Sequence, residues 1–155
     1  MSVLSCDREG LREIPLEAMD AVLAAARRAF DLVVVDLPRH LDAATELVLS
    51  ASTRTLLVVP AEVRATAAAS ALAALAARVA PDVRVLVRGP APSGLPADVV
   101  AEAIGLPLAG SVREEPGLAA ALERGDPPGR RGRGPLAEFC AGFLADLELP
   151  RQAAA

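Results

Sequence analysis

Residues 31–38, DLVVVDLP, decide the predicted fold. Residues 32–35 are all apolar and three are β-branched, which predicts a short strand buried on both faces, as in a parallel sheet covered by helices. Asp36 follows at the carboxyl end of this strand, where open α/β sheets bind ligands. A carboxylate there commonly orders a magnesium ion beside a phosphate, but it can also cap the next helix or satisfy a turn. Position alone leaves both roles of Asp36 open.

Strands and helices alternate along the rest of the chain. Further strands are predicted at 2–5 (an edge strand), 54–59, 83–87 and 108–112, and helices at 15–29, 42–50, 62–79, 98–104, 115–124 and 136–147. This order predicts an α/β fold with a three-layer, doubly wound, mostly parallel sheet and right-handed crossovers. We expect residues 1–150 to form one domain and residues 151–155 to form a frayed tail.

Composition excludes several classes of function. A net charge of -4 argues against a protein that binds nucleic acid by neutralising phosphates, so no sequence-specific nucleic-acid partner is expected. The longest uncharged helical run, residues 65–77, is too short to span a membrane, and the first residues lack the pattern of a signal peptide. We therefore expect a cytoplasmic chain. Cys6 and Cys140 lie far apart without CxxC spacing, so reduced thiols are expected instead of a disulfide or a zinc site.

Lysine is absent from the sequence, in which every basic residue apart from the single histidine is arginine. A P-loop needs a lysine that reaches the β- and γ-phosphates of a nucleotide, and a Schiff-base enzyme needs a lysine as its nucleophile. Neither chemistry can be complete within this chain. No catalytic residue is predicted.

Three segments, in this order, carry a resemblance to a known family. They are AARRAFDLVVVDLPRHLD (25–42), TLLVVPAEVRATAAA (55–69) and VRVLVRGPAPSGLPADVVAEAIGLPLAGSVREEPGLAAALERGDPPGRR (83–131). Together they resemble the C-terminal half of the MinD/ParA-type P-loop ATPases of the SIMIBI class. The most similar branch is the CpaE-like one, which is linked to septum-site determination and to pilus or secretion assembly.

The resemblance implies a role for each of several residues. It places Asp36 in the switch region beside magnesium and the γ-phosphate, with Leu37 and Pro38 in the switch loop. Asp36 is then the residue implied to bind the metal, and Mg-ATP is the cofactor that the family implies.

The same resemblance implies where the adenine would lie. In that family the strand equivalent to 83–87 ends near the base, where MinD-like members carry asparagine, and here the equivalent position is Arg88 or Gly89. The segment with Asp126 and Pro127 resembles the loop that borders the base.

The chain also departs from the family. The deviant Walker A motif, which is rich in glycine and has two lysines, lies on and just after a central strand that precedes the region matched here. We therefore expect a P-loop NTPase-like fold that lacks the P-loop strand, which would leave the neighbouring strand edges unpaired.

Two functional hypotheses follow from this departure. In the first, the chain is a localisation or regulatory module without ATPase activity of its own, which binds another protein or a copy of itself through the open sheet edge or the Asp36 face. In the second, it is the C-terminal part of an active Mg-ATP-dependent ATPase whose P-loop lies in further N-terminal sequence.

Other signals favour ordinary structural roles. DLVVVDLP also resembles the phosphoacceptor strand of receiver domains, but the acidic pair and the lysine that receivers need are absent. His40, the single histidine, is expected at the surface or in a cap. The arginines in the loop 130–133 can bind an acidic partner, a phosphate or nucleic acid, although a solvated loop is favoured. Residues 136–147 form an apolar face that is expected to pack on the sheet, with membrane contact at most peripheral, because its polar face is acidic.

Overall fold

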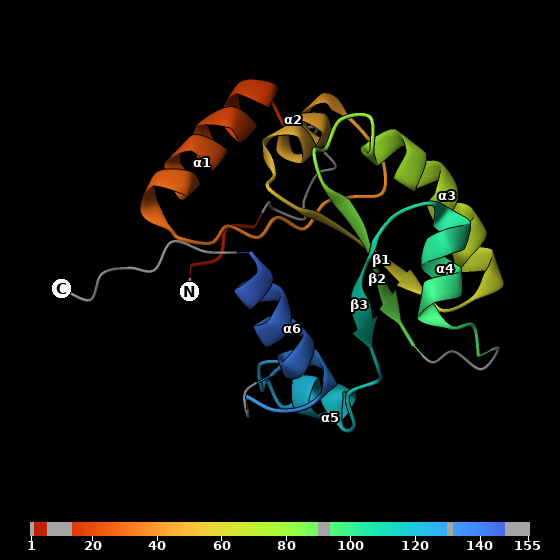
Figure 1. Ribbon diagram of the computed structural model, residues 1–155. Helices are drawn as coiled ribbons and strands as arrows, with labels where there is room; N and C mark the ends of the chain where they lie inside the picture. The colour runs from red at the N-terminus through yellow and green to blue at the C-terminus, as the bar shows by residue number, and fades with distance from the viewer. Residues whose placement is uncertain (1, 6–13, 90–93, 130–131, 148–155) are drawn as a thin grey trace. The chain divides into compact units, whose positions relative to one another are not determined.

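The computed structural model describes residues 2–5, 14–89, 94–129 and 132–147 of the chain. The chain folds into two compact units, Met1–Val48 and Leu49–Ala155, and each is described by itself. The elements in the described residues are, in order, α1 (Leu16–Ala29), α2 (Ala43–Ala51), β1 (Thr55–Pro60), α3 (Val63–Ala76), β2 (Val83–Arg88), α4 (Ala97–Ile104), β3 (Leu108–Val112), α5 (Leu118–Glu123) and α6 (Pro135–Asp146) (Figure 1).

The first unit contains α1 and the start of α2. Pro15 precedes α1, and its carbonyl accepts hydrogen bonds from the backbone N–H groups of Ala18 and Met19 at 3.0 and 3.1 Å. A proline suits this position because it has no N–H to leave unpaired at a helix start. Both helices predicted in this part of the sequence are confirmed.

The predicted strand at residues 32–35 is wrong. These residues form no strand in the structure, and the side chain of Val34 is 83 % exposed. A strand is stabilised by backbone hydrogen bonds to a neighbour, and no described segment pairs with residues 32–35. Residues 2–5 likewise form no strand, so the edge strand predicted there is also wrong. An apolar run indicates that burying its side chains is favourable. It does not supply the neighbouring strand that a β-strand needs for its backbone hydrogen bonds.

The second unit is built on a parallel three-stranded sheet in the order β1-β2-β3. Thr55 pairs with Val83 and Pro60 with Arg88, and the β2–β3 register shifts once, between Val85 and Leu86. The three strands predicted in this region and the α/β class with an open parallel sheet are therefore confirmed. The strand order contains no reversal within the described residues.

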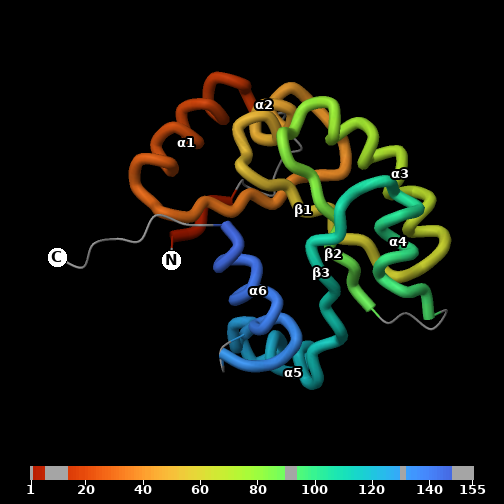
Figure 2. Tube along the Cα trace, in the orientation of Figure 1, coloured from red at the N-terminus to blue at the C-terminus, as the bar shows by residue number. Residues whose placement is uncertain are grey.

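Helices α3 and α4 cover one face of this sheet (Figures 1 and 2). The core between them is made of small side chains: Val59, Val85 and Val87 from the strands, Ala69 and Ala73 from α3, and Val100, Ala101 and Ile104 from α4. Alanine on the inner side of α3 allows the helix backbone to approach the sheet closely. This explains how a chain with 2 % aromatic residues builds a core.

Helix α6 packs against the other face of the sheet, at β3. In the β2–β3 pair, Gly110 lies opposite Leu86, and Leu86 points away from the α3–α4 side because side chains alternate along a strand. A Cβ atom added to Gly110 would lie 3.0 Å from the Phe139 ring of α6. The second unit therefore has three layers, and the prediction that the last helix packs on the sheet is confirmed.

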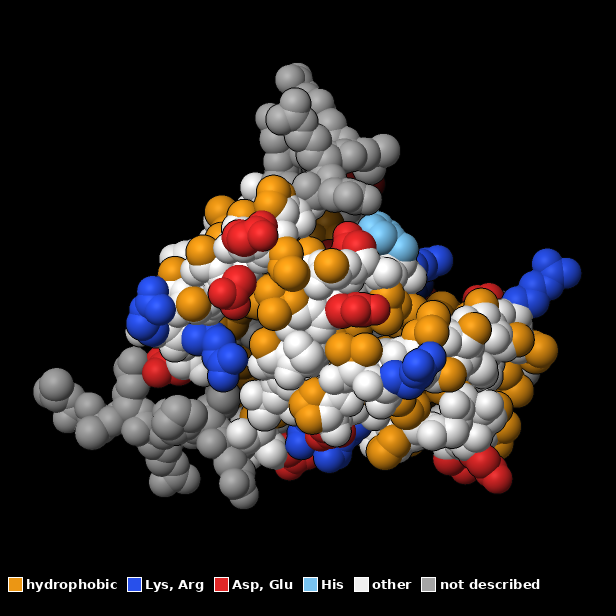
Figure 3. All heavy atoms as spheres, turned by 90° about the horizontal axis from the view of Figure 1, so that it is seen from above, with side chains coloured by type: hydrophobic (Ala, Val, Ile, Leu, Met, Phe, Trp, Pro, Cys, Tyr) orange, Lys and Arg blue, Asp and Glu red, His pale blue; other side chains and the backbone are white. Residues whose placement is uncertain are grey.

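None of the helices in the described residues is long and apolar enough to cross a membrane. Hydrophobic side chains nevertheless reach the surface in many places, as the view in Figure 3 shows. The most exposed large ones outside the N-terminal segment are Val34, Val63 and Val58, at 83, 66 and 58 % exposure.

Candidate functional site: the carboxyl edge of the sheet

The three strands end side by side. The carbonyl of Arg88 accepts a hydrogen bond from the N–H of Ala61, and the N–H of Gly89 donates to the carbonyl of Val112, both at 3.0 Å. The residues that follow β1, β2 and β3 are therefore held at one edge, the edge at which open parallel sheets bind ligands.

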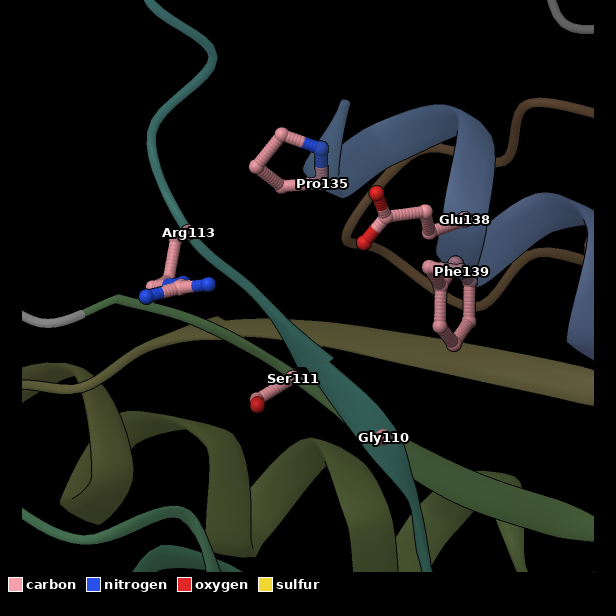
Figure 4. Close-up of a pocket in the computed structure, with 6 residues that line it drawn as sticks. All are labelled: Gly110, Ser111, Arg113, Pro135, Glu138 and Phe139. Atoms are coloured by element: carbon pink, nitrogen blue, oxygen red, sulfur yellow. The ribbon is translucent and has the colours of Figure 1, made fainter. Parts of the chain in front are cut away.

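A pocket of about 340 Å³ opens where β3 ends and α6 begins (Figure 4). Its lining residues are Gly110, Ser111, Arg113, Pro135, Glu138 and Phe139. Figure 4 shows Ser111 and Arg113 on the β3 side, and Pro135, Glu138 and Phe139 on the α6 side. The pocket thus combines one cation, one anion, one hydroxyl group and an apolar surface. Sequence reasoning missed it, because residues 111 and 138 meet only through the packing of α6.

Glu115 holds the start of α6 beside this pocket. Its carboxylate accepts a hydrogen bond from the N–H of Leu136 at 3.3 Å, which satisfies one of the unpaired donors at the helix N-terminus. Gly134 precedes the helix with φ +110°, and a Cβ atom there would overlap the Glu115 carboxylate. The close approach of the backbone to Glu115 therefore requires glycine at this position.

Two aromatic rings hold the middle and the end of α6. The Phe139 and Phe143 rings stack with centroids 5.6 Å apart, and the Arg54 guanidinium lies 5.8 Å from the Phe143 centroid. Arg54 in turn donates a hydrogen bond from Nε to Asp82 at 2.9 Å. This chain of contacts joins the end of α6 to the amino ends of β1 and β2.

Asp82 is shared by two arginines. Nε of Arg84 donates to one carboxylate oxygen at 3.0 Å, and Nε of Arg54 donates to the other. The Arg84 hydrogen bond, together with that from Arg54, lowers the pKa of Asp82 below its ordinary value, against the opposing effect of desolvation. The sequence contains a weak signal for this cluster. Arg84 is two residues after Asp82, a spacing that puts both on one side of an extended strand.

The residues predicted to bind nucleotide fall in both units. Asp36 and Pro38 are exposed and Leu37 is half-buried, and all three belong to the first unit, in the segment that forms no strand. Arg88 ends β2 with an exposed side chain, and Gly89 follows it.

Asp126 follows the last turn of α5. Its carboxylate accepts a hydrogen bond from Nε of Arg124 at 3.3 Å, and its N–H donates to the Ala121 carbonyl at 2.9 Å. Pro127 is exposed next to it. Asp126 thus has local partners that tie it to its own loop. Its implied place beside an adenine stays a prediction.

The part of the chain that the structure describes contains no group of three or more His, Cys, Asp or Glu side chains that could hold a metal ion. Asp36, the implied magnesium ligand, therefore belongs to no such group among these residues. The residues 90–93, 130–131 and 151–155, including two arginines of the basic loop and the predicted tail, lie outside the described residues, as does Cys6.

His40 and Asp42 form a small capping group before α2. The Asp42 carboxylate accepts a hydrogen bond from the N–H of Thr45 at 2.7 Å, and this bond lowers the pKa of Asp42. Nε2 of His40 lies 3.5 Å from the same carboxylate, and its side chain is 73 % exposed. The predicted surface position of His40 is confirmed.

Comparison with known proteins finds two similar chains, both from Mycobacterium tuberculosis. They are the uncharacterized proteins MT3760 (strain CDC 1551 / Oshkosh) and Rv3660c (strain H37Rv), each 45 % identical over 125 residues. The alignment covers 81 % of this chain and 35 % of each relative, so it spans about a third of the length of the curated relatives. No family model and no solved structure matches the chain.

Proposed function

We propose that this chain is a MinD/CpaE-like localisation or regulatory module that acts by binding protein in the cytoplasm. The process it serves would be septum placement or the assembly of a pilus or secretion system. In this proposal the chain does not hydrolyse ATP by itself. It would use the parallel strands β1, β2 and β3 and their carboxyl edge as part of a P-loop NTPase-like sheet, without the phosphate-binding lysines.

One observation carries the proposal. The segments that resemble the family after residue 54 form adjacent parallel strands, and their carboxyl ends carry Arg88 and Arg113 in a chain that has no lysine. An arginine at a strand end can attract an anionic or acidic partner, but it cannot replace the P-loop lysine within a glycine-rich cradle.

The residues present do not fit Mg-ATP as a tightly held cofactor. The implied magnesium ligand, Asp36, is an exposed carboxylate in a segment that forms no strand, and no described acidic cluster supports it. A magnesium ion bound with ATP usually takes one or two carboxylates together with phosphate oxygens that a P-loop holds in place. Without such a loop, one exposed carboxylate is a weak ligand.

The second hypothesis, the C-terminal part of an active ATPase, is favoured by the lengths of the relatives. The chain spans about a third of each of them, so the remaining two thirds have room for a P-loop and its central strand. Here Asp36 would help to order magnesium, and the β2 end with Arg88 would border the base. In-frame coding sequence upstream of Met1 for a KGG-GK[ST]-like motif would support this hypothesis, and its absence would contradict it.

A calorimetric titration with Mg-ATP tests the first proposal. We expect no heat of binding at physiological ATP concentration for the chain or for Asp36→Asn, because neither has a phosphate cradle. Asp20→Asn, an exposed aspartate on α1, is the matched control for the lost charge. Micromolar binding that is weakened in Asp36→Asn but kept in Asp20→Asn would overturn the non-catalytic proposal and assign a nucleotide site to Asp36.

A further inference from the structure

The pocket between β3 and α6 has no part in the proposed function. All of its lining residues belong to the second unit, so its geometry does not depend on where the first unit lies. Its volume of about 340 Å³ is near the lower end of the range for small-molecule sites, which runs from about 300 to 1,000 Å³. The pocket therefore has room for a small metabolite.

Two opposite charges lie on the two sides of this pocket. Arg113 is on the β3 side, and the Glu138 carboxylate extends from α6 toward that side (Figure 4). Within the described ranges, neither side chain forms an ion pair or a hydrogen bond, and no ion pair joins the two. Both charges are therefore available to a ligand.

Two other charged groups in this part of the chain already have partners. Nη2 of Arg124 lies 3.3 Å from the Asp126 carboxylate, and the Glu115 carboxylate accepts the N–H of Leu136 at the start of α6. Neither group neutralises a charge of the pocket. A molecule that carries both a carboxylate and an ammonium group would satisfy both sides of the pocket at once.

An apolar wall lies beside the two charges. Phe139 and Pro135 form it, and both are half-buried, so part of each side chain reaches the pocket. The Phe139 ring lies against the strand backbone at Gly110, where an added Cβ atom would be 3.0 Å from the ring. This contact fixes the position of the ring, on which an apolar group of a ligand can pack.

We infer that this pocket binds a free amino acid with an apolar side chain, in its zwitterionic form. The ligand carboxylate accepts hydrogen bonds from the Arg113 guanidinium, whose planar donors match a carboxylate. The ligand ammonium donates to Glu138, and the ligand side chain packs on Phe139. A simple anion would satisfy only Arg113, and an uncharged apolar molecule would leave both charges without a partner.

Such a ligand touches β3 and α6 together. No residue of α6 is fully buried, so a molecule that bridges the two elements adds to the few contacts that hold this helix. Binding to the folded state also raises the melting temperature. The inference goes beyond the proposed function, because it gives a protein-binding module a small-molecule effector site. It does not involve Mg-ATP, so the two titrations can fail separately.

An NMR titration of the 155-residue chain with L-phenylalanine tests the inference. We expect saturable shifts of the Gly110 and Phe139 amide signals. Phenylalanine amide lacks the carboxylate, and 3-phenylpropionate lacks the ammonium group. Each should bind the wild type about threefold to fivefold more weakly than L-phenylalanine does, because a single exposed ion pair contributes modestly.

Charge-removing variants show which residue meets which group of the ligand. Arg113→Gln should weaken the binding of L-phenylalanine and leave that of phenylalanine amide unchanged, because the amide has no carboxylate to lose. Glu138→Gln should do the same for L-phenylalanine and 3-phenylpropionate. Arg64→Gln on α3 and Glu102→Gln on α4 are matched controls at exposed positions outside the pocket. Circular dichroism checks that each variant is folded.

Three results would overturn the inference. The first is the absence of saturable shifts at millimolar L-phenylalanine. The second is equal affinity of the wild type for all three ligands, because binding would then depend on the apolar ring alone. The third is an equal loss of affinity in the pocket variants and in their controls. The comparison of ligands uses the wild type only, so it holds even if a variant fails to fold.

Discussion

At the scale of single residues, Asp82 links a pair of arginines to the packing of α6. It accepts hydrogen bonds from Arg54 and Arg84, and Arg54 also lies over the Phe143 ring. The Asp82 carboxylate therefore orients the Arg54 guanidinium, which contacts the end of α6. A partly exposed group of this kind contributes modestly, because water and salt screen its ion pairs.

Replacing Asp82 by Asn should lower the free energy of unfolding by about 1 kcal/mol at neutral pH, because the asparagine cannot accept two charge-assisted hydrogen bonds. The pKa of Asp82 is lowered in the folded state, so its stabilisation is present above the ordinary value of 3.8 and is lost as the pH falls through the lower folded-state value. Urea unfolding of the wild type and of Asp82→Asn at several acidic pH values measures this loss of stability.

Asp20→Asn, an exposed aspartate beyond the first turn of α1, is the control for a lost surface charge. The difference in stability between the wild type and Asp82→Asn should vanish at low pH. A difference that stays constant with pH would contradict the role given to the Asp82 charge.

At the scale of elements, α6 makes stabilising contacts at three points along its length. Glu115 caps its start, Phe139 packs on Gly110 in its middle, and Phe143 meets Arg54 near its end. None of its residues is fully buried, so these few contacts hold the third layer on the sheet. The pocket between β3 and α6 depends on them.

Two glycine substitutions should therefore act in opposite directions. Gly134→Ala should destabilise the protein by about 1 kcal/mol or more, because the residue has φ +110° and its Cβ would overlap Glu115. Gly142→Ala, within α6, should stabilise by about 0.5–1 kcal/mol, because a Cβ there meets nothing and alanine favours helix. Denaturant unfolding of both variants provides the comparison.

Equal effects of the two substitutions would contradict the contact between Gly134 and Glu115. Glu115→Gln separates the charge of the cap from its shape, since glutamine can still accept the hydrogen bond from Leu136. Glu115→Gln should lower the free energy of unfolding by less than Gly134→Ala does.

At the scale of the whole molecule, the well-packed core lies within one unit. Every residue of the main hydrophobic cluster, from Val59 to Ile104, belongs to the second unit, Leu49–Ala155. The first unit contains the buried Ala44 and Val48 as well as the exposed Val34.

A shortened chain of residues 52–155, which begins after α2, should fold on its own, because it keeps the three strands and the helices that cover them. We expect a cooperative thermal transition by circular dichroism and dispersed amide signals in NMR spectra. The 155-residue chain is the control. A broad, non-cooperative transition would show that residues before 52 contribute to the core.

Much of this arrangement could be predicted from local patterns. Runs such as TLLVV and VRVLV, bounded by proline and glycine, predicted β1 and β2 within about one residue, because their apolar β-branched residues suit a covered parallel strand. Helical periodicity likewise predicted each helix of the described residues to within a few residues. The pocket and the contact of Arg54 with Asp82 could not be predicted, because they join residues far apart in the chain.

By itself, the sequence determined the α/β class, the order of helices and strands from β1 onward, and the lack of a lysine for a phosphate cradle. Each of these follows from side-chain chemistry or from periodicity along the chain. Tertiary structure alone decided whether DLVVVDLP forms a strand, because a strand exists only where a neighbour supplies its backbone hydrogen bonds, and no described segment does so. It likewise decided that the strands of the described residues pair in the order β1-β2-β3.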